Sequence, residues 1–187
     1  MADLHPQLAA IDAELRATTA RARQLVDAVD EAAFHARPDT DRWSIAECLA
    51  HLNLTSEAYL PLIDEVVTSG RGPAPQRFRR DWMGWLLGRM AEPPVRARVK
   101  TTAPFVPRST GSKQQVLTEY EALQEKLAAA LRSADGFDLG RLRIVSPFKA
   151  RFRYNLYSAF RIIPAHQRRH LRQGERVLEA LGKAPHF

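Results

Sequence analysis

The chain has 187 residues, of which 45% are hydrophobic and 26% are charged. A chain of this length can bury a core without disulfides, so we expect one globular domain spanning residues 1–187. The single cysteine excludes an intrachain disulfide framework and makes a reducing cytoplasm the expected compartment. No apolar run approaches the ~20 residues of a membrane span, and residues 1–10 lack the pattern of a signal peptide.

The formal net charge of +7 raises nucleic acid and anionic membranes as partners of the chain. Its basic residues are spread along the sequence in several short clusters, without one dominant basic run. We therefore expect a small-molecule substrate, with nucleic acid or a membrane surface as the less favoured partner. A non-catalytic basic binding module with a structural or vestigial metal site remains the alternative interpretation.

Hydrophobic residues recur at helical spacing in four long segments. The first runs from Pro6 to Val29, the second begins at Ser44 and ends before Gly70, the third begins at Ser112, and the fourth runs from Tyr154 to Leu181. No alternating strand pattern and no internal repeat is visible in the sequence. These segments predict an all-α fold, a four-helix bundle.

Two of the four helices have a clear start signal. Ser44 with Glu47, and Ser112 with Gln115, match the capping box, in which the serine caps the helix and the residue three positions later bonds back. These signals fix where the second and third helices begin.

Residues 71–111 differ from the rest of the chain because they are rich in proline and arginine. Their short apolar stretch, Trp82 to Met90, predicts a helix. A long segment with so little periodicity is typical of a functional cover. We therefore expect an insert that packs as a lid over the bundle, in preference to an interfacial membrane helix. Residues 133–152 are predicted to be irregular.

Two histidines, His166 and His170, are four residues apart in the fourth helix. At this spacing they lie on one face, about 6 Å apart along the axis, so both imidazoles could bind one ion. That face also carries Ile163 and Val177 and is otherwise apolar, and an unpaired polar group would be costly there. The pair therefore predicts a divalent metal site, with Zn, Ni or Fe as the ion.

A third ligand has few candidates. His5 and His186 lie near the termini and His35 lies in a predicted loop, whereas His51 lies inside a predicted core helix. On a helical wheel His51 falls at the shoulder of the apolar face, from which a side chain can reach a neighbouring helix. Alternatively, His51 is an ordinary half-exposed histidine and the spacing of the pair arises by chance. Three imidazoles with open coordination positions are typical of reactive metal sites.

Two stretches that contain these histidines are residues 43–52 (WSIAECLAHL) and residues 166–173 (HQRRHLRQ). They resemble the two motifs of the DinB/YfiT-like superfamily: tryptophan–serine, glutamate, histidine–leucine, and then two histidines followed by a glutamine. The resemblance implies an up-down-down-up four-helix bundle, often dimeric, with a divalent metal ion held by His51, His166 and His170. The insert at 71–111 departs from the minimal pattern of the family.

Members of that superfamily include transferases and isomerases that use low-molecular-weight thiols such as bacillithiol, mycothiol or glutathione. The resemblance thus implies a metal-dependent enzyme, either a thiol-dependent S-transferase or a hydrolase. In the first case the metal would bind the thiol as a thiolate, and Arg151, Arg153, Arg168 and Arg169 are candidates to hold its carboxylates. In the second case the metal would lower the pKa of a bound water toward neutrality.

Two residues just before His51 have side chains that could take part in catalysis. Glu47 is a candidate general base, but its use in the capping box is the favoured interpretation. Cys48 is a candidate thiol, but we interpret it as a small buried apolar residue. No general base is assigned from the sequence.

Overall fold

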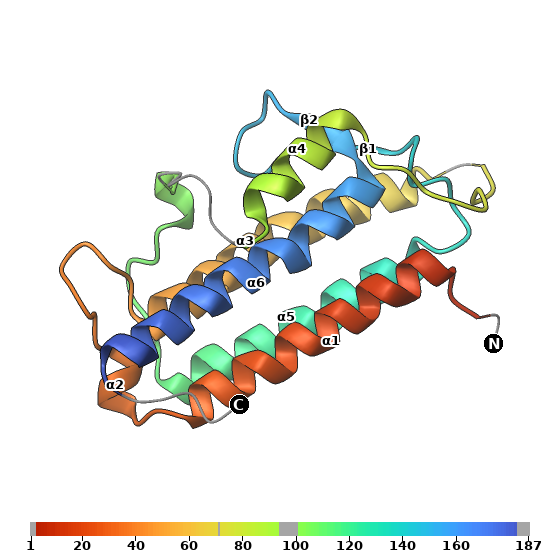
Figure 1. Cartoon of the computed structure of the whole chain (residues 1–187). Helices are drawn as coiled ribbons and strands as arrows, with labels where there is room; N and C mark the ends of the chain where they lie inside the picture. The colour runs from red at the N-terminus through yellow and green to blue at the C-terminus, as the bar shows by residue number, and fades with distance from the viewer. Residues whose placement is uncertain (1–2, 71, 94–100, 183–187) are drawn as a thin grey trace.

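The computed structural model describes residues 3–70, 72–93 and 101–182, and within them the chain is mostly helical (Figure 1). The helices are α1 (Pro6–Asp27), α2 (Glu31–His35), α3 (Ile45–Thr68), α4 (Trp82–Ala91), α5 (Lys113–Ser133) and α6 (Leu156–Ala180), with a short 3-10 helix, η1 (Ala103–Phe105). Two short strands, β1 (Arg143–Val145) and β2 (Arg153–Asn155), pair in antiparallel fashion. The prediction of a helical fold is confirmed.

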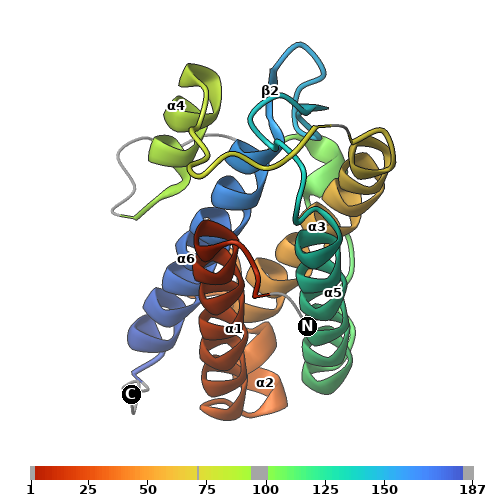
Figure 2. The same ribbon diagram turned by 90° about the vertical axis from the view of Figure 1, so that its right-hand side faces the viewer.

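Four long helices, α1, α3, α5 and α6, lie side by side and enclose the core (Figures 1 and 2). Each of α1 and α3 packs against both α5 and α6. Two apolar clusters fill the space between them, one around Phe160 and Ile163 and the other around Leu25 and Leu49. Each fully buried side chain of this size stabilises the fold by about 1.5–3 kcal/mol. The core therefore holds α3 and α6, the two helices that carry the predicted ligands, against each other.

Both predicted capping boxes are present. Ser44 Oγ accepts a hydrogen bond from the Glu47 N–H at 3.2 Å, and Glu47 Oε2 accepts one from the Ser44 N–H at 2.9 Å. Ser112 and Gln115 form the same reciprocal pair at the start of α5. These bonds satisfy backbone donors that have no partner within the helix, so each box fixes its start.

Residues 133–152 were predicted to be irregular and no strand pattern was visible, but the structure forms β1 within that segment and β2 directly after it. Strands of three residues are too short to show the alternation of apolar and polar residues on which strand prediction depends. For the same reason α6 begins at Leu156, two residues later than predicted: Tyr154 and Asn155 belong to β2, and Asn155 then caps the helix.

The helix predicted from Trp82 to Met90 is confirmed as α4, which packs along α6 (Figure 1). Gly84 and Gly88 are the buried residues of α4. A Cβ atom at position 84 would lie 2.1 Å from the Cβ of Ser158 in α6, so the two helices approach each other through the absence of a side chain.

None of the helices in the described part of the chain is long and apolar enough to cross a membrane. Of the insert predicted at 71–111, residue 71 and residues 94–100 lie outside the described residues. The remainder of that segment contains α4 and η1.

Candidate metal centre

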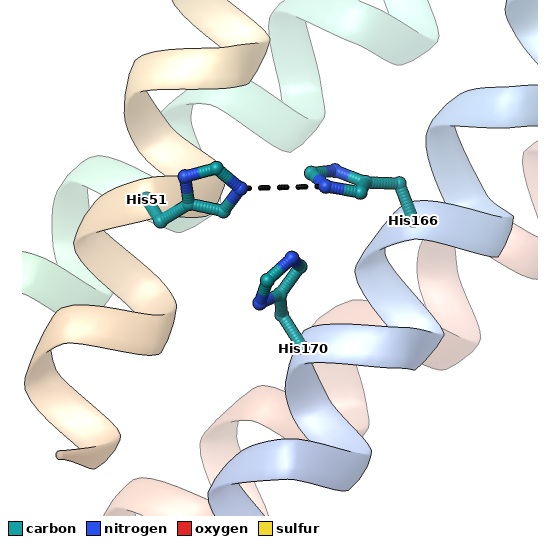
Figure 3. A group of neighbouring side chains, drawn as sticks. All are labelled: His51, His166 and His170. Carbon is teal, nitrogen blue, oxygen red and sulfur yellow. Dashed lines mark hydrogen bonds between the residues drawn. The ribbon is translucent and has the colours of Figure 1, made fainter. Parts of the chain in front are cut away.

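His51 of α3 meets His166 and His170 of α6 across the helix contact (Figure 3). One nitrogen from each ring lies within 4.8 Å of the other two, and the Nε2 atoms of His51 and His166 are 3.3 Å apart. Two nitrogens bound at about 2.1 Å to one tetrahedral ion would be roughly 3.4 Å apart. The spacing of the His51 and His166 nitrogens therefore suits a single small divalent ion, and His170 lies close enough to be its third ligand.

The orientation of His51 is fixed by a backbone group. Its Nδ1 lies 2.7 Å from the carbonyl oxygen of Phe105, at the end of η1. A carbonyl can only accept a hydrogen bond, so Nδ1 carries the proton and the lone pair of Nε2 faces the other two histidines. Metal-binding histidines are commonly fixed by such a bond from the second ring nitrogen.

The surroundings keep all three imidazoles neutral. Burial holds the pKa of His166 and of His170 well below the usual histidine value, and the neighbouring histidines and the Arg169 guanidinium lower both further. Burial also lowers the pKa of His51; the bond to Phe105 opposes this effect, and the Arg169 charge adds to it. Neutral imidazole is the form that binds a metal, so these residues are prepared for an ion at neutral pH.

Aromatic rings enclose the three histidines. Trp43 stacks on His170, with ring centroids 5.8 Å apart, and lies 5.1 Å from the ring of His51. Phe148 lies 5.6 Å from His166 on the other side. His51 and His170 are buried, whereas His166 is partly exposed. An apolar collar of this kind keeps the local dielectric low around any charge placed there.

A large cavity opens beside the histidines, and all three line it. Its volume is about 1780 Å³, well above the roughly 300–1,000 Å³ of an ordinary small-molecule site. Side chains of α4 form one wall, and α6 and the loop before α3 contribute others. Seven basic side chains line the cavity against three acidic ones; three of the basic ones, Arg21, Arg168 and Arg172, form ion pairs with glutamates, and the basic excess that remains favours anions.

A comparison with protein-family models matches residues 14–173 to the DinB superfamily. The chain belongs to the DinB superfamily. The match begins in α1 and includes His51 as well as the two histidines of α6. No curated protein and no solved structure matches the chain.

Of the four arginines predicted around the site of this DinB superfamily chain, two line the cavity. Arg169 contributes its charge directly beside the histidines. Arg168 also lines the cavity, but its guanidinium donates to Glu92 at 2.6 and 2.7 Å and to Glu14 at 2.7 Å. It thus ties α6 to α1 and to the end of α4. Arg151 and Arg153 are exposed and are not among the residues that line the cavity.

Glu47 and Cys48 are both occupied elsewhere. The Glu47 carboxylate accepts hydrogen bonds from Ser44 and from Arg37. Burial raises the pKa of Glu47, but these bonds outweigh it and the net pKa is below the usual value. Cys48 is a free, buried cysteine, and burial raises the pKa of its thiol. Neither residue lines the large cavity, so neither supplies a base or nucleophile there.

The remaining histidines lie apart from this centre. His5 was expected at a frayed terminus, but it caps α1: its Nδ1 accepts the Gln7 N–H at 3.2 Å, and its ring packs on Phe78. His35 was expected in a loop, but it ends the short helix α2. His186 lies outside the described residues.

A tyrosine pair on the cavity wall escaped the sequence analysis. The hydroxyls of Tyr59 and Tyr154 are 2.7 Å apart, and both residues line the cavity. Burial raises the pKa of both phenols, so they remain protonated. A tyrosine on an apolar helix face needs a hydrogen-bond partner for its hydroxyl, so Tyr59 in the sequence already indicated that a partner must exist. The identity of that partner depended on the unpredicted strand β2.

Proposed function

We propose that this DinB superfamily chain is a metal-dependent enzyme that transfers a low-molecular-weight thiol to an electrophile. We assign His51, His166 and His170 as the ligands of one divalent ion, with Zn, Ni or Fe as the candidates. The observation that carries the proposal is the meeting of three neutral imidazoles at the wall of a large basic cavity.

A divalent ion held by three neutral imidazoles keeps its full double charge and lowers the pKa of a thiol or water bound to it. The chain's own residues prepare that position. The Phe105 carbonyl fixes the ring of His51, while Trp43 and Phe148 shield the rings of the other histidines. The hydroxyls of Tyr59 and Tyr154, which are hydrogen-bonded to each other, add a polar pair to the cavity lining.

Thiol transfer is favoured over hydrolysis because none of the three carboxylates that line the cavity shifts the pKa of the histidines. Among the described residues, the charged groups that shift the pKa of the three histidines are other histidines and Arg169, with no carboxylate. Hydrolysis by an activated water commonly uses a general base, and Glu47 is held by Arg37 and Ser44. A thiol has a lower pKa than water from the start and needs no such base.

We further propose that the four long helices form the up-down-down-up bundle of the family, with α1 and α6 parallel and α3 and α5 opposed to them. Contacts that support these directions are Gln7–Tyr157 and Leu25–Gly174 between α1 and α6, Asp12–Arg132 and Arg23–Glu121 between α1 and α5, His51–His170 between α3 and α6, and Tyr59–Tyr154 between α3 and β2, the strand that leads into α6. A homodimer, a single domain and a cytoplasmic location remain predictions.

The test is a thiol-dependent assay on the untagged full chain. The protein is stripped with a chelator and reloaded with Zn²⁺, Ni²⁺ or Fe²⁺, and a panel of glutathione, mycothiol and bacillithiol is offered with a bimane electrophile. We expect consumption of the electrophile that needs both the thiol and the metal. We expect His51→Ala to reduce this rate to background and His35→Ala, which alters a histidine on α2, to leave it unchanged.

Two outcomes would overturn the proposal. The first is a rate that is equal in the stripped and reloaded protein, which would exclude a role for the ion. The second is metal-dependent turnover of an ester or amide substrate with no requirement for a thiol, which would identify a hydrolase.

A further inference from the structure

The cavity beside the histidines differs in chemistry at its two ends. Along α6, Ile162 lies one turn before His166 and lines the cavity, and Arg176 lies beyond His170 and lines it too. With a rise of about 1.5 Å per residue, Ile162 is about 6 Å from His166 along the axis, and Arg176 is about 9 Å from His170 on the other side. The histidines therefore lie between an apolar end and a basic end.

The apolar end is formed by α4. Met83, Leu86 and Leu87 line the cavity from this helix, next to Ile162 of α6. Trp82 also lines it and is 70% exposed, whereas Trp85 is 51% exposed on α4 and does not line it. A contiguous exposed apolar surface of this kind usually marks a binding site.

The basic end is formed by arginines from α6 and from the loop before α3. Arg42 and Arg176 line the cavity and are exposed, and neither forms an ion pair within the described part of the chain. Arg172 lies beside them but shares Glu175 and Glu179. Asp39 and Asp41 are acidic side chains on the loop that carries Arg42 and also line the cavity, so the anion-binding groups at this end are Arg42 and Arg176, whose charges no ion pair in the described part of the chain offsets.

We infer that the electrophilic substrate of this site is an elongated amphipathic anion. Its acid group, a carboxylate, sulfonate or phosphate ester, binds Arg42 and Arg176, and its apolar part lies along α4, so that its middle passes the histidines. A cavity of about 1780 Å³ has room for such a molecule in addition to a thiol. This inference rests on the proposed function only for the identity of the reacting centre, because the binding itself needs no metal.

The test uses alkanesulfonates, whose head group is a weak metal ligand. Hexane-, octane- and decanesulfonate, below their micelle concentrations, are titrated calorimetrically into the full chain, both stripped of metal and reloaded. We expect the affinity to rise about tenfold for every two added methylenes, because each lies on the apolar wall. We expect octan-1-ol, which lacks the charge, to bind at least about tenfold more weakly than octanesulfonate.

Paired variants locate the two ends. The double variant Arg42→Gln/Arg176→Gln should weaken the affinity for decanesulfonate about tenfold or more and leave the affinity for octan-1-ol unchanged. Arg153→Gln, which removes an exposed arginine outside the cavity, should leave both affinities unchanged. Leu86→Gln should flatten the dependence on chain length, and Trp85→Gln, on the same helix but outside the cavity, should not. Circular dichroism confirms that each variant is folded.

Several results would overturn the inference. They are an affinity independent of chain length, equal affinity for octan-1-ol and octanesulfonate, or undiminished binding in the double arginine variant. Binding to vesicles of anionic phospholipid that Trp85→Gln abolishes would identify α4 as a membrane surface and would also contradict it. Because the stripped protein is measured as well, failure of the metal proposal and failure of this inference are distinguishable.

Discussion

The orientation of His51 depends on one backbone carbonyl, that of Phe105. Any side chain at position 105 could supply that carbonyl, so no residue type in the sequence signals it. The three histidines themselves could be predicted, because His51, His166 and His170 lie on or beside the apolar faces of two predicted core helices. At the scale of single residues, the grouping of the three histidines was thus predictable and the group that orients one of them was not.

Glu47 lies about one turn before His51, and a substitution there can tell whether its role is structural or catalytic. Glutamine at this position keeps the capping box with Ser44, because a Gln side chain also accepts from the cap N–H, but it cannot act as a base. We expect Glu47→Gln to change the free energy of unfolding by less than about 1 kcal/mol, since Arg37, its partner in the ion pair that is lost, is half-exposed and remains solvated. Metal content and the thiol-dependent rate, measured side by side, should match the unsubstituted chain. A large loss of rate with normal metal content would make Glu47 the base after all.

At the scale of elements, the close approach of α4 to α6 depends on Gly84. A methyl group there would meet the Ser158 Cβ and Oγ, both at 2.1 Å, and Ser158 is fully buried. We expect Gly84→Ala to displace α4 at a cost of about 1–3 kcal/mol, typical of overpacking. Amide hydrogen exchange of residues 82–91 and the thermal unfolding midpoint measure both effects.

Gly88→Ala is the matched control on the same helix. Its nearest neighbour is the guanidinium end of Arg80, at 3.0 Å, which can move. Alanine also favours a helix over glycine by about 1 kcal/mol, so this variant should be neutral or slightly stabilising. Equal protection of the α4 amides in both variants would show that the helix contact does not depend on the missing side chain at position 84.

The elements that were predicted correctly have a local signal, and the ones that were missed do not. Ser44 with Glu47 and Ser112 with Gln115 determine where α3 and α5 begin through bonds made within four residues. The strand β2 forms only because the chain folds back onto β1, and three residues carry no period of their own. Tertiary pairing therefore decided the structure where local preference was weak.

For the whole molecule, a bound ion would join α3 to α6. An ion that binds only the folded chain stabilises it by about 4 kcal/mol at a thousand times its dissociation constant. In a chain of this size that corresponds to a rise in Tm of roughly 10 °C. We expect Zn²⁺ to produce such a rise, measured by scanning calorimetry after chelation and readdition, and His170→Ala to show none. An equal rise in both proteins would mean that the ion binds elsewhere.

The cavity could not be predicted from the sequence, because it is assembled from separate parts of the chain. Arg42 precedes α3 and Arg176 lies near the end of α6, and only the packed structure brings both into the lining of one cavity. Conversely, Arg151 and Arg153, close in sequence to the start of α6, lie outside it. The spacing of His166 and His170 can be read from the sequence because both residues belong to one helix. A binding surface made of several segments can be seen only in the packed molecule.

The central claim is that His51, His166 and His170 hold one divalent ion, and metal stoichiometry tests it most directly. The untagged full chain, the His170→Ala variant and the His35→Ala variant are stripped, exposed to Zn²⁺, desalted and measured by elemental analysis. The account predicts one ion per chain in the unsubstituted protein and in His35→Ala, and none in His170→Ala. An unsubstituted protein that retains no ion, or a His170→Ala variant that retains a full equivalent, would contradict it.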